Sequence, residues 1–168
     1  MRGSTVLTDA FERVRDAVHP AANGLTVEEL AYRPDAESNS IAWLVWHLTR
    51  IQDDHVAALA GVAQVWNSAG WADRFALPFD ESDTGYGHDA DAVEAVVADA
   101  ASLLGYFEDV HAATVAYVAA LEDADLDRVV DRAWDPPVTV GVRLVSVIAD
   151  DLQHAGQAAY VRGILHRR

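Results

Sequence analysis

Apolar residues recur about every 3.6 positions in four long stretches of this chain, which is the spacing of one face of an α-helix. In the last stretch, Leu144 and Val147 are part of this pattern. Residues typical of helix ends flank the second stretch, because Asn39 or Ser40 can cap its start and Gly61 follows its end. The pattern predicts long helices over residues 8–22, 40–60, 99–121 and 139–166.

The segments between these helices are less regular. Thr26-Val27-Glu28-Glu29 fits a capping box and predicts a short helix that ends by Pro34. Glycine and proline interrupt residues 62–91, which predicts an irregular connection with short helices only. Within this connection, the polar loop 83–88 is either a lid or wall over a site or a purely structural loop. Residues 126–131 favour a short extended piece.

Together these elements predict an all-α protein, a four-helix bundle with a long irregular connection between the second and third long helices. The chain shows no internal repeat and no linker, and its length suits one core. We therefore expect a single domain over residues 1–168.

Composition narrows the range of partners. The formal net charge of −15 argues against nucleic acid, since phosphate binding needs a basic surface. No run of eighteen apolar residues is present and the N-terminus lacks a signal-like apolar region, so we expect no membrane span and a cytoplasmic location. The chain contains no cysteine and no lysine, which excludes cysteine ligands, a cysteine nucleophile and Schiff-base catalysis. Any thiol chemistry would therefore use a bound thiol.

Two residues of the last helix have side chains that suit a metal ion. Asp150 and His154 are four residues apart, which places them about 40° apart around a helix axis and on one face. A carboxylate and an imidazole in this arrangement form part of a metal site only if another helix supplies a further ligand. His47 lies beside the apolar seam of the second long helix, where a histidine buried in the core is the alternative interpretation. His55 on the same helix is the rival ligand.

Several residues near these ligands are candidates for supporting roles. Asp54 lies on nearly the same face as His47 and either orients it or is solvated. Arg143 precedes Asp150 by two helical turns and either anchors a carboxylate or sugar hydroxyl or lies at a solvated rim, and Arg50 has the same two interpretations. We expect His111 to be exposed or hydrogen-bonded.

Two segments carry a family resemblance: residues 39–48, NSIAWLVWHL, and residues 150–157, DDLQHAGQ. The chain resembles the DinB/YfiT-like metal-binding four-helix bundles over essentially its whole length. Within that superfamily, residues 83–88, 134–139 and 143–146 resemble the small actinobacterial mycothiol S-transferases.

This resemblance implies a metal triad of His47, Asp150 and His154. Many members of the superfamily have histidine at the position of Asp150, whereas the mycothiol-dependent maleylpyruvate isomerases have a carboxylate there. We do not expect the extra C-terminal domain of those isomerases in this chain, which makes maleylpyruvate a less expected substrate. The implied cofactor is a divalent ion, foremost Zn²⁺, with Ni²⁺, Mn²⁺ and Fe²⁺ as alternatives.

The implied function is a metal-dependent transferase that joins a low-molecular-weight thiol, similar to mycothiol, to an electrophilic small molecule. The alternatives are a thiol-dependent isomerase or hydrolase on the same site, and a non-catalytic metal-binding stress protein. A homodimer is expected from the family. We expect Asp54 and Gln157 to orient the ligands, and the residues expected to contact substrate are Arg143, Arg50, Trp43, Tyr86 and His88.

Overall fold

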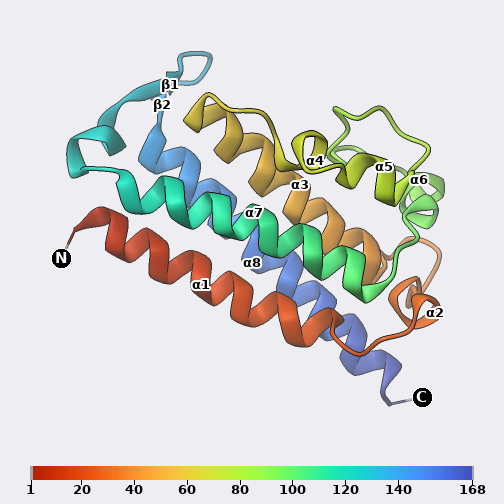
Figure 1. Cartoon of the computed structure of the whole chain (residues 1–168). Coiled ribbons are helices and arrows are strands. Elements are labelled where there is room, and N and C mark those ends of the chain that lie inside the picture. The colour runs from red at the N-terminus through yellow and green to blue at the C-terminus, as the bar shows by residue number, and fades with distance from the viewer. Residues whose placement is uncertain (1, 168) are drawn as a thin grey trace.

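The computed structural model describes residues 2–167, and four long helices run lengthwise through this part of the chain (Figure 1). α8 packs against α1 and α3, and α7 packs against the same two helices. α1 and α8 run in one direction and α3 and α7 in the other, so that the bundle is of mixed direction (Figure 1). The predicted all-α bundle is confirmed. Its long helices are α1 (Gly3–Ala22), α3 (Ile41–Ala60), α7 (Ala100–Ala120) and α8 (Val140–Leu165).

The long helices begin and end at residues with local capping chemistry. The hydroxyl of Ser40 accepts a hydrogen bond from the backbone N–H of Trp43 at 3.1 Å, and Asp99 and Thr139 cap α7 and α8 in the same way. Gly61 ends α3 with a left-handed φ of 69°. The predicted ends of α3, α7 and α8 therefore agree with the structure to within a residue or two.

The start of α1 was predicted wrongly. The helix begins at Gly3 rather than at Thr8. The backbone N–H of Gly3 donates to Asp123 Oδ1 at 2.8 Å, and Leu7 is buried against the rest of the bundle. Asp123 belongs to a distant 3₁₀ turn, η1 (Asp123–Asp127), so this extra stabilisation arises only in the folded chain.

The connections contain short elements only. The turn η1 takes up part of the segment expected to be extended, and β1 pairs antiparallel with β2, a pairing that the sequence did not predict. No helix in residues 2–167 has the length and hydropathy required to cross a membrane. The short elements are α2 (Val27–Leu30), α4 (Val65–Ser68), α5 (Trp71–Phe75), α6 (Ala90–Ala95), β1 (Val129–Asp131) and β2 (Val138–Thr139).

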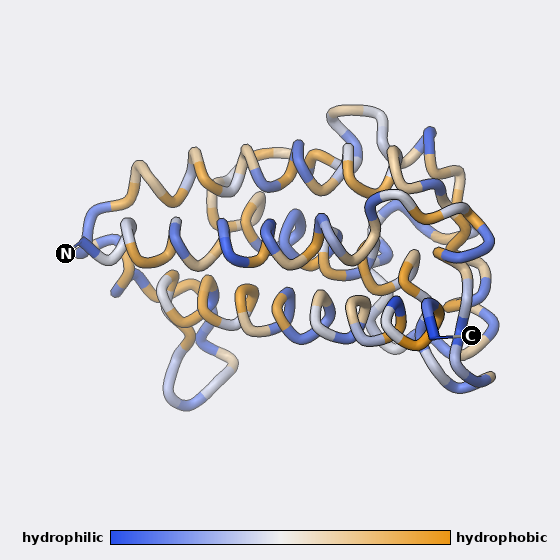
Figure 2. The backbone as a smooth tube through the Cα atoms, turned by 90° about the horizontal axis from the view of Figure 1, so that it is seen from below, coloured by the Kyte–Doolittle hydropathy of each residue, from blue (hydrophilic) through white to orange (hydrophobic). Residues whose placement is uncertain are grey.

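The first half of α3 is the most enclosed part of the fold. Hydrophobic and hydrophilic positions alternate along the long helices (Figure 2), yet every residue from 41 to 50 is buried. α7 and α8 cover two sides of this segment, and the connection after α3 covers a further one. That connection packs inward through Trp66, Trp71 and Phe75, which gather around the Tyr106 ring of α7. A polar side chain in this part of α3 is therefore shielded from water, and a partner inside the protein compensates for the lost hydration.

Candidate metal centre

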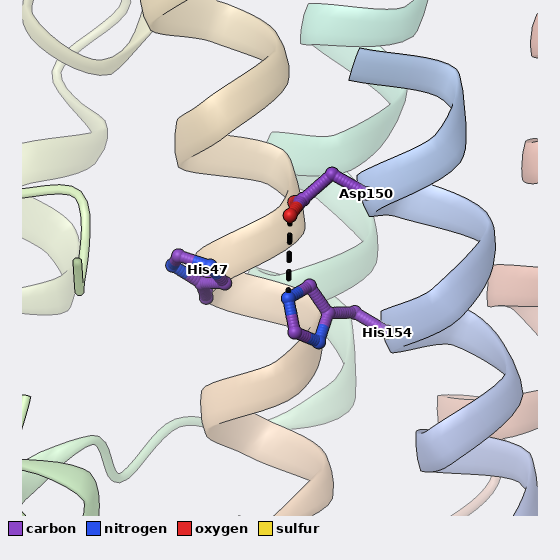
Figure 3. A group of neighbouring side chains, drawn as sticks. All are labelled: His47, Asp150 and His154. Carbon is purple, nitrogen blue, oxygen red and sulfur yellow. Dashed lines mark ion pairs between the residues drawn. The ribbon is translucent and has the colours of Figure 1, made fainter. Parts of the chain in front are cut away.

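Three side chains from two helices meet beside this buried half of α3. His47 extends from α3 toward Asp150 and His154, which both extend from α8 (Figure 3). One potential ligand atom of each residue lies within 4.8 Å of those of the other two. Among the described residues, this is the one such group of three or more His, Cys, Asp or Glu side chains. His55, the rival ligand, is not part of the group.

The orientation of His47 is set by a backbone carbonyl. Its Nδ1–H donates to the carbonyl oxygen of Thr84 at 2.5 Å, which leaves Nε2 with the free lone pair. The ring stacks on Trp43 with centroids 4.5 Å apart. Burial lowers the pKa of His47, so the imidazole is kept in the neutral form that binds metal. A carbonyl that fixes the second nitrogen is a common arrangement for metal-ligating histidines.

Asp150 and His154 form an ion pair, with Oδ1 3.5 Å from Nε2 (Figure 3). His154 Nδ1–H donates to Gln157 Oε1 at 2.9 Å, so that Nε2 faces the other two residues. The hydrogen bond with Asp150 raises the pKa of His154. Burial raises the pKa of Asp150, but the hydrogen bond and charge of His154 outweigh it, and the net pKa is lowered.

These residues fit a divalent cation. Asp150 Oδ2 is buried and has no hydrogen-bond partner within residues 2–167. A buried carboxylate oxygen without a donor is costly unless a positive charge lies beside it. Nε2 of His154 and the unbonded nitrogen of His47 lie near this carboxylate, so two nitrogens and one carboxylate converge, and a bound cation would replace the His154 proton that pairs with Asp150. Such a set suits a site with three protein ligands and open positions for exogenous ligands.

The loop 83–88 forms the wall of the site next to His47. His88 Nδ1 accepts a hydrogen bond from Trp43 Nε1–H at 3.1 Å, and His88 Nε2–H donates to Asp83. Both nitrogens of His88 are thus engaged, and its side chain is buried. Tyr86 extends outward and is 91% exposed. This loop is therefore a wall that hydrogen bonds hold against α3. It also supplies the Thr84 carbonyl that binds His47, a contact that the sequence did not reveal.

Arg50 does not lie at a substrate site or at a solvated rim, which corrects both of its sequence interpretations. The side chain is fully buried and binds the backbone carbonyl oxygens of Glu81 and Asp83. Its guanidinium also donates to Gln64 and Tyr106, so no donor-rich face is left for a ligand. The sequence around Arg50 gave no sign of this role, because its hydrogen-bond partners are distant in the chain.

The other residues singled out in the sequence lie in different surroundings. Asp54 does not contact His47 but accepts a hydrogen bond from Gln64 at 2.7 Å and lies 3.6 Å from His55. Arg143 forms an ion pair with Asp131 at 3.4 Å. His111, on the far side of the bundle, is buried and bonded to Glu12, in line with one of its two predicted states.

Comparison with known proteins identifies the family. Residues 10–158 match the model of the DinB superfamily. The chain belongs to the DinB superfamily. A conserved protein of Enterococcus faecalis, known from its crystal structure, is 30% identical and superposes with a TM-score of 0.93 over 100% of this chain and 99% of the other. No curated protein matches this chain.

Membership in the DinB superfamily, which includes metal-binding enzymes, agrees with the triad geometry. It supports a divalent metal site at His47, Asp150 and His154 and leaves the identity of the metal open. The structure adds two supporting groups that sequence reasoning missed, the Thr84 carbonyl and Gly85 beside it. The glycines that flank position 86 were the available signal for a close backbone approach.

Proposed function

We propose that this DinB protein is a divalent-metal-dependent transferase that joins a low-molecular-weight thiol to an electrophilic small molecule. The observation that carries the proposal is the convergence of two imidazoles and one carboxylate with an unpartnered Asp150 oxygen. A divalent cation held there would supply a positive charge that favours the thiolate form of a bound thiol at neutral pH. Because the chain has no cysteine, the reacting thiol must be a cosubstrate.

The residues of the triad would hold the ion and keep it in one position. Thr84 and Gln157 hold the two imidazole rings in the orientation that presents a free nitrogen. Burial keeps His47 neutral, so it does not need to lose a proton before it binds. These side chains act as ligands and positioning groups, and none of them needs to act as the nucleophile.

A hollow next to the triad has a size and a wall that suit a polar cosubstrate. Its volume is about 760 Å³, and Gln157, the partner of His154, forms part of its wall. A cavity of this size suits a ligand larger than a simple thiol such as mercaptoethanol. The wall offers hydroxyl, amide and carboxylate groups, which suit a cosubstrate rich in hydroxyls, as mycothiol is. Its polar residues are Asp35, Glu37, Ser38, Asn39, Gln153, Gln157 and Tyr160. The metal proposed is Zn²⁺, since the ligand set of nitrogen and oxygen is one that zinc accepts.

The proposal is tested by thiol consumption. Purified protein is assayed for metal content and then for loss of mycothiol or glutathione in the presence of a bimane electrophile, with and without a chelator. We expect turnover with mycothiol to exceed turnover with glutathione, to disappear on chelation and to return with Zn²⁺. Turnover that survives chelation would refute the proposal.

Two variants connect the activity to the triad. His154→Ala is expected to lose stoichiometric metal and turnover together, because it removes one of three ligands. His166→Ala, an exposed histidine at the end of α8, is the matched control and should keep both. If metal remains bound in the wild type but no thiol is consumed, the protein binds metal without acting as a transferase.

A further inference from the structure

A second hollow lies at the other side of the triad along the same two helices. Its volume is about 490 Å³. On α3 it begins at His55, about two turns after His47, and on α8 it begins at Arg143, about two turns before Asp150. We call it the arginine hollow, and its lining includes His55, Leu59, Arg128, Val130 and Arg143.

The charge of the arginine hollow is opposite to that of the whole protein. The chain has a formal net charge of −15, yet two of its arginines meet here. Arg143 has one carboxylate partner, Asp131, at 3.4 Å, and Arg128 is exposed at the rim. The lining itself holds two guanidinium groups and no carboxylate, so an anion that enters from solvent can pair with them, and the apolar side chains Leu59 and Val130 offer contact to a hydrocarbon body.

The arginine hollow is electrostatically connected to the triad through His55. Burial and the positive charge of Arg143 lower the pKa of His55, whereas the charges of Asp54 and Asp150 oppose this. The charges of Arg143 and of the metal ligand Asp150 thus both act on His55. Along α8, Arg143 and Asp150 are seven positions apart, which is about 10 Å of helix axis. An arginine side chain and a molecule with one aromatic ring can together span that distance.

We propose that the arginine hollow binds a carboxylate of the electrophilic substrate and so directs its reactive carbon to the metal centre. This inference rests on the proposed transferase function. Arg128 and Arg143 bind the carboxylate, and Leu59 and Val130 contact the ring or chain that carries it. With an aryl chloride, the thiolate sulfur forms a bond to the ring carbon, chloride leaves with the bonding electron pair, and the thiol proton passes to solvent.

Binding tests the hollow without any reaction. Calorimetry on metal-free protein compares 3-nitrobenzoate with 3-nitrobenzamide, which has the same shape but no charge. We expect the benzoate to bind more tightly, and Arg128→Gln or Arg143→Gln to weaken it roughly tenfold. Arg143→Lys keeps the charge and should recover part of the affinity. Arg132→Gln, an exposed arginine outside the hollow, is the control and should not change it.

Two results of the binding experiment would overturn the inference. One is equal affinity for benzoate and benzamide, and the other is unchanged benzoate affinity in all three hollow variants while their melting temperatures remain close to that of the wild type. Neither result depends on thiol turnover. Refutation of carboxylate binding in the hollow can therefore be told apart from refutation of the transferase proposal.

Kinetics then connect the hollow to the reaction. With the zinc-loaded enzyme and mycothiol, the ratio of kcat/KM for 4-chloro-3-nitrobenzoate to that for 4-chloro-3-nitrobenzamide should fall roughly tenfold in the arginine variants. Retained binding of nitrobenzoate with no thiol turnover would leave the hollow supported and the transferase proposal refuted. If the variants instead change the KM of mycothiol alone, the hollow binds the thiol, and the assignment to the electrophile is wrong.

Discussion

Gly85 shows how one small residue controls the candidate metal centre. Its φ is +89°, a left-handed conformation that favours glycine. A Cβ at this position would lie 2.8 Å from His47 Nδ1 and 3.0 Å from the Trp46 ring. The absence of a side chain therefore allows the neighbouring Thr84 carbonyl to reach the imidazole.

Gly85→Ala is expected to weaken metal binding by about tenfold to a hundredfold, because the new methyl group displaces the carbonyl that orients His47. Gly87→Ala is the matched control. Gly87 also has a left-handed φ of +80°, but a Cβ there meets nothing within 4 Å. Zinc affinity is measured by competition with a chromogenic chelator. Equal affinities for the two variants would show that backbone strain, and not contact with His47, determines the effect.

Asp151 is next to the ligand Asp150 in the sequence, but it is a buried carboxyl group outside the metal centre. It is fully buried, and neither carboxylate oxygen has a hydrogen-bond partner in the described part of the chain. Burial, with a smaller contribution from the charge of Asp150, raises the pKa of Asp151 well above its ordinary value. An unpaired buried carboxyl group destabilises the folded state.

Asp151→Asn is therefore expected to raise the free energy of unfolding by about 1 kcal/mol or more at neutral pH, since the amide has a similar size and no charge to bury. Urea denaturation of metal-free protein measures the change. Asp127→Asn, at an exposed position, removes the same charge and should have little effect. A loss of stability in Asp151→Asn would indicate that the carboxyl group has a partner that supports the fold.

At the scale of elements, α3 and the connection that follows it form one unit. Arg50 donates to the carbonyl oxygens of Glu81 and Asp83 at 3.2 and 3.1 Å. Its guanidinium lies 3.7 Å from Asp53, which itself accepts hydrogen bonds from the N–H groups of Val65 and Trp66. The buried charges thus join the helix to both α4 and the wall of the site, and the position of the wall depends on them.

Arg50→Met is expected to lower the free energy of unfolding by about 3–5 kcal/mol, because it leaves Asp53 as a buried charge without its partner. Metal affinity should fall as well, since the connection loses the two bonds from Arg50 to the carbonyl oxygens of Glu81 and Asp83, which hold it and loop 83–88 against α3. Urea denaturation and zinc competition measure the two effects. In the double variant Arg50→Met/Asp53→Asn, part of the stability should return. A loss below about 1 kcal/mol in the single variant would contradict the structural role assigned to Arg50.

At the scale of the whole molecule, the strongest feature is the excess of negative charge. The sequence has 27 acidic and 12 basic residues, so that most carboxylates cannot be paired. Repulsion among exposed carboxylates destabilises a compact state and extends over about 10 Å at 0.1 M salt. Exposed ion pairs such as Arg13–Asp9 contribute little in the other direction.

Sodium chloride is therefore expected to raise the melting temperature of the metal-free protein between about 0.01 and 0.2 M, because it screens the net repulsion more than it weakens the surface ion pairs. Differential scanning calorimetry measures the change. An unchanged or lower melting temperature would indicate that local ion pairs dominate the electrostatics of this bundle.

The sequence by itself determined the local structure. Helix period and capping residues depend on neighbours within about four positions, and so Ser40, Gly61 and Thr139 marked helix ends correctly. For the same reason, the spacing of Asp150 and His154 was enough to place both side chains on one face of a helix. The resemblance to the DinB superfamily supplied His47 as their partner.

Only the tertiary structure decided what faces these residues. His47, rather than His55, meets Asp150 and His154 because of how α3 packs against α8. The burial of Arg50 and the approach of the Thr84 carbonyl also depend on partners more than thirty positions away. Such contacts arise from packing and long-range hydrogen bonds, which leave no periodic signal in the sequence around each residue.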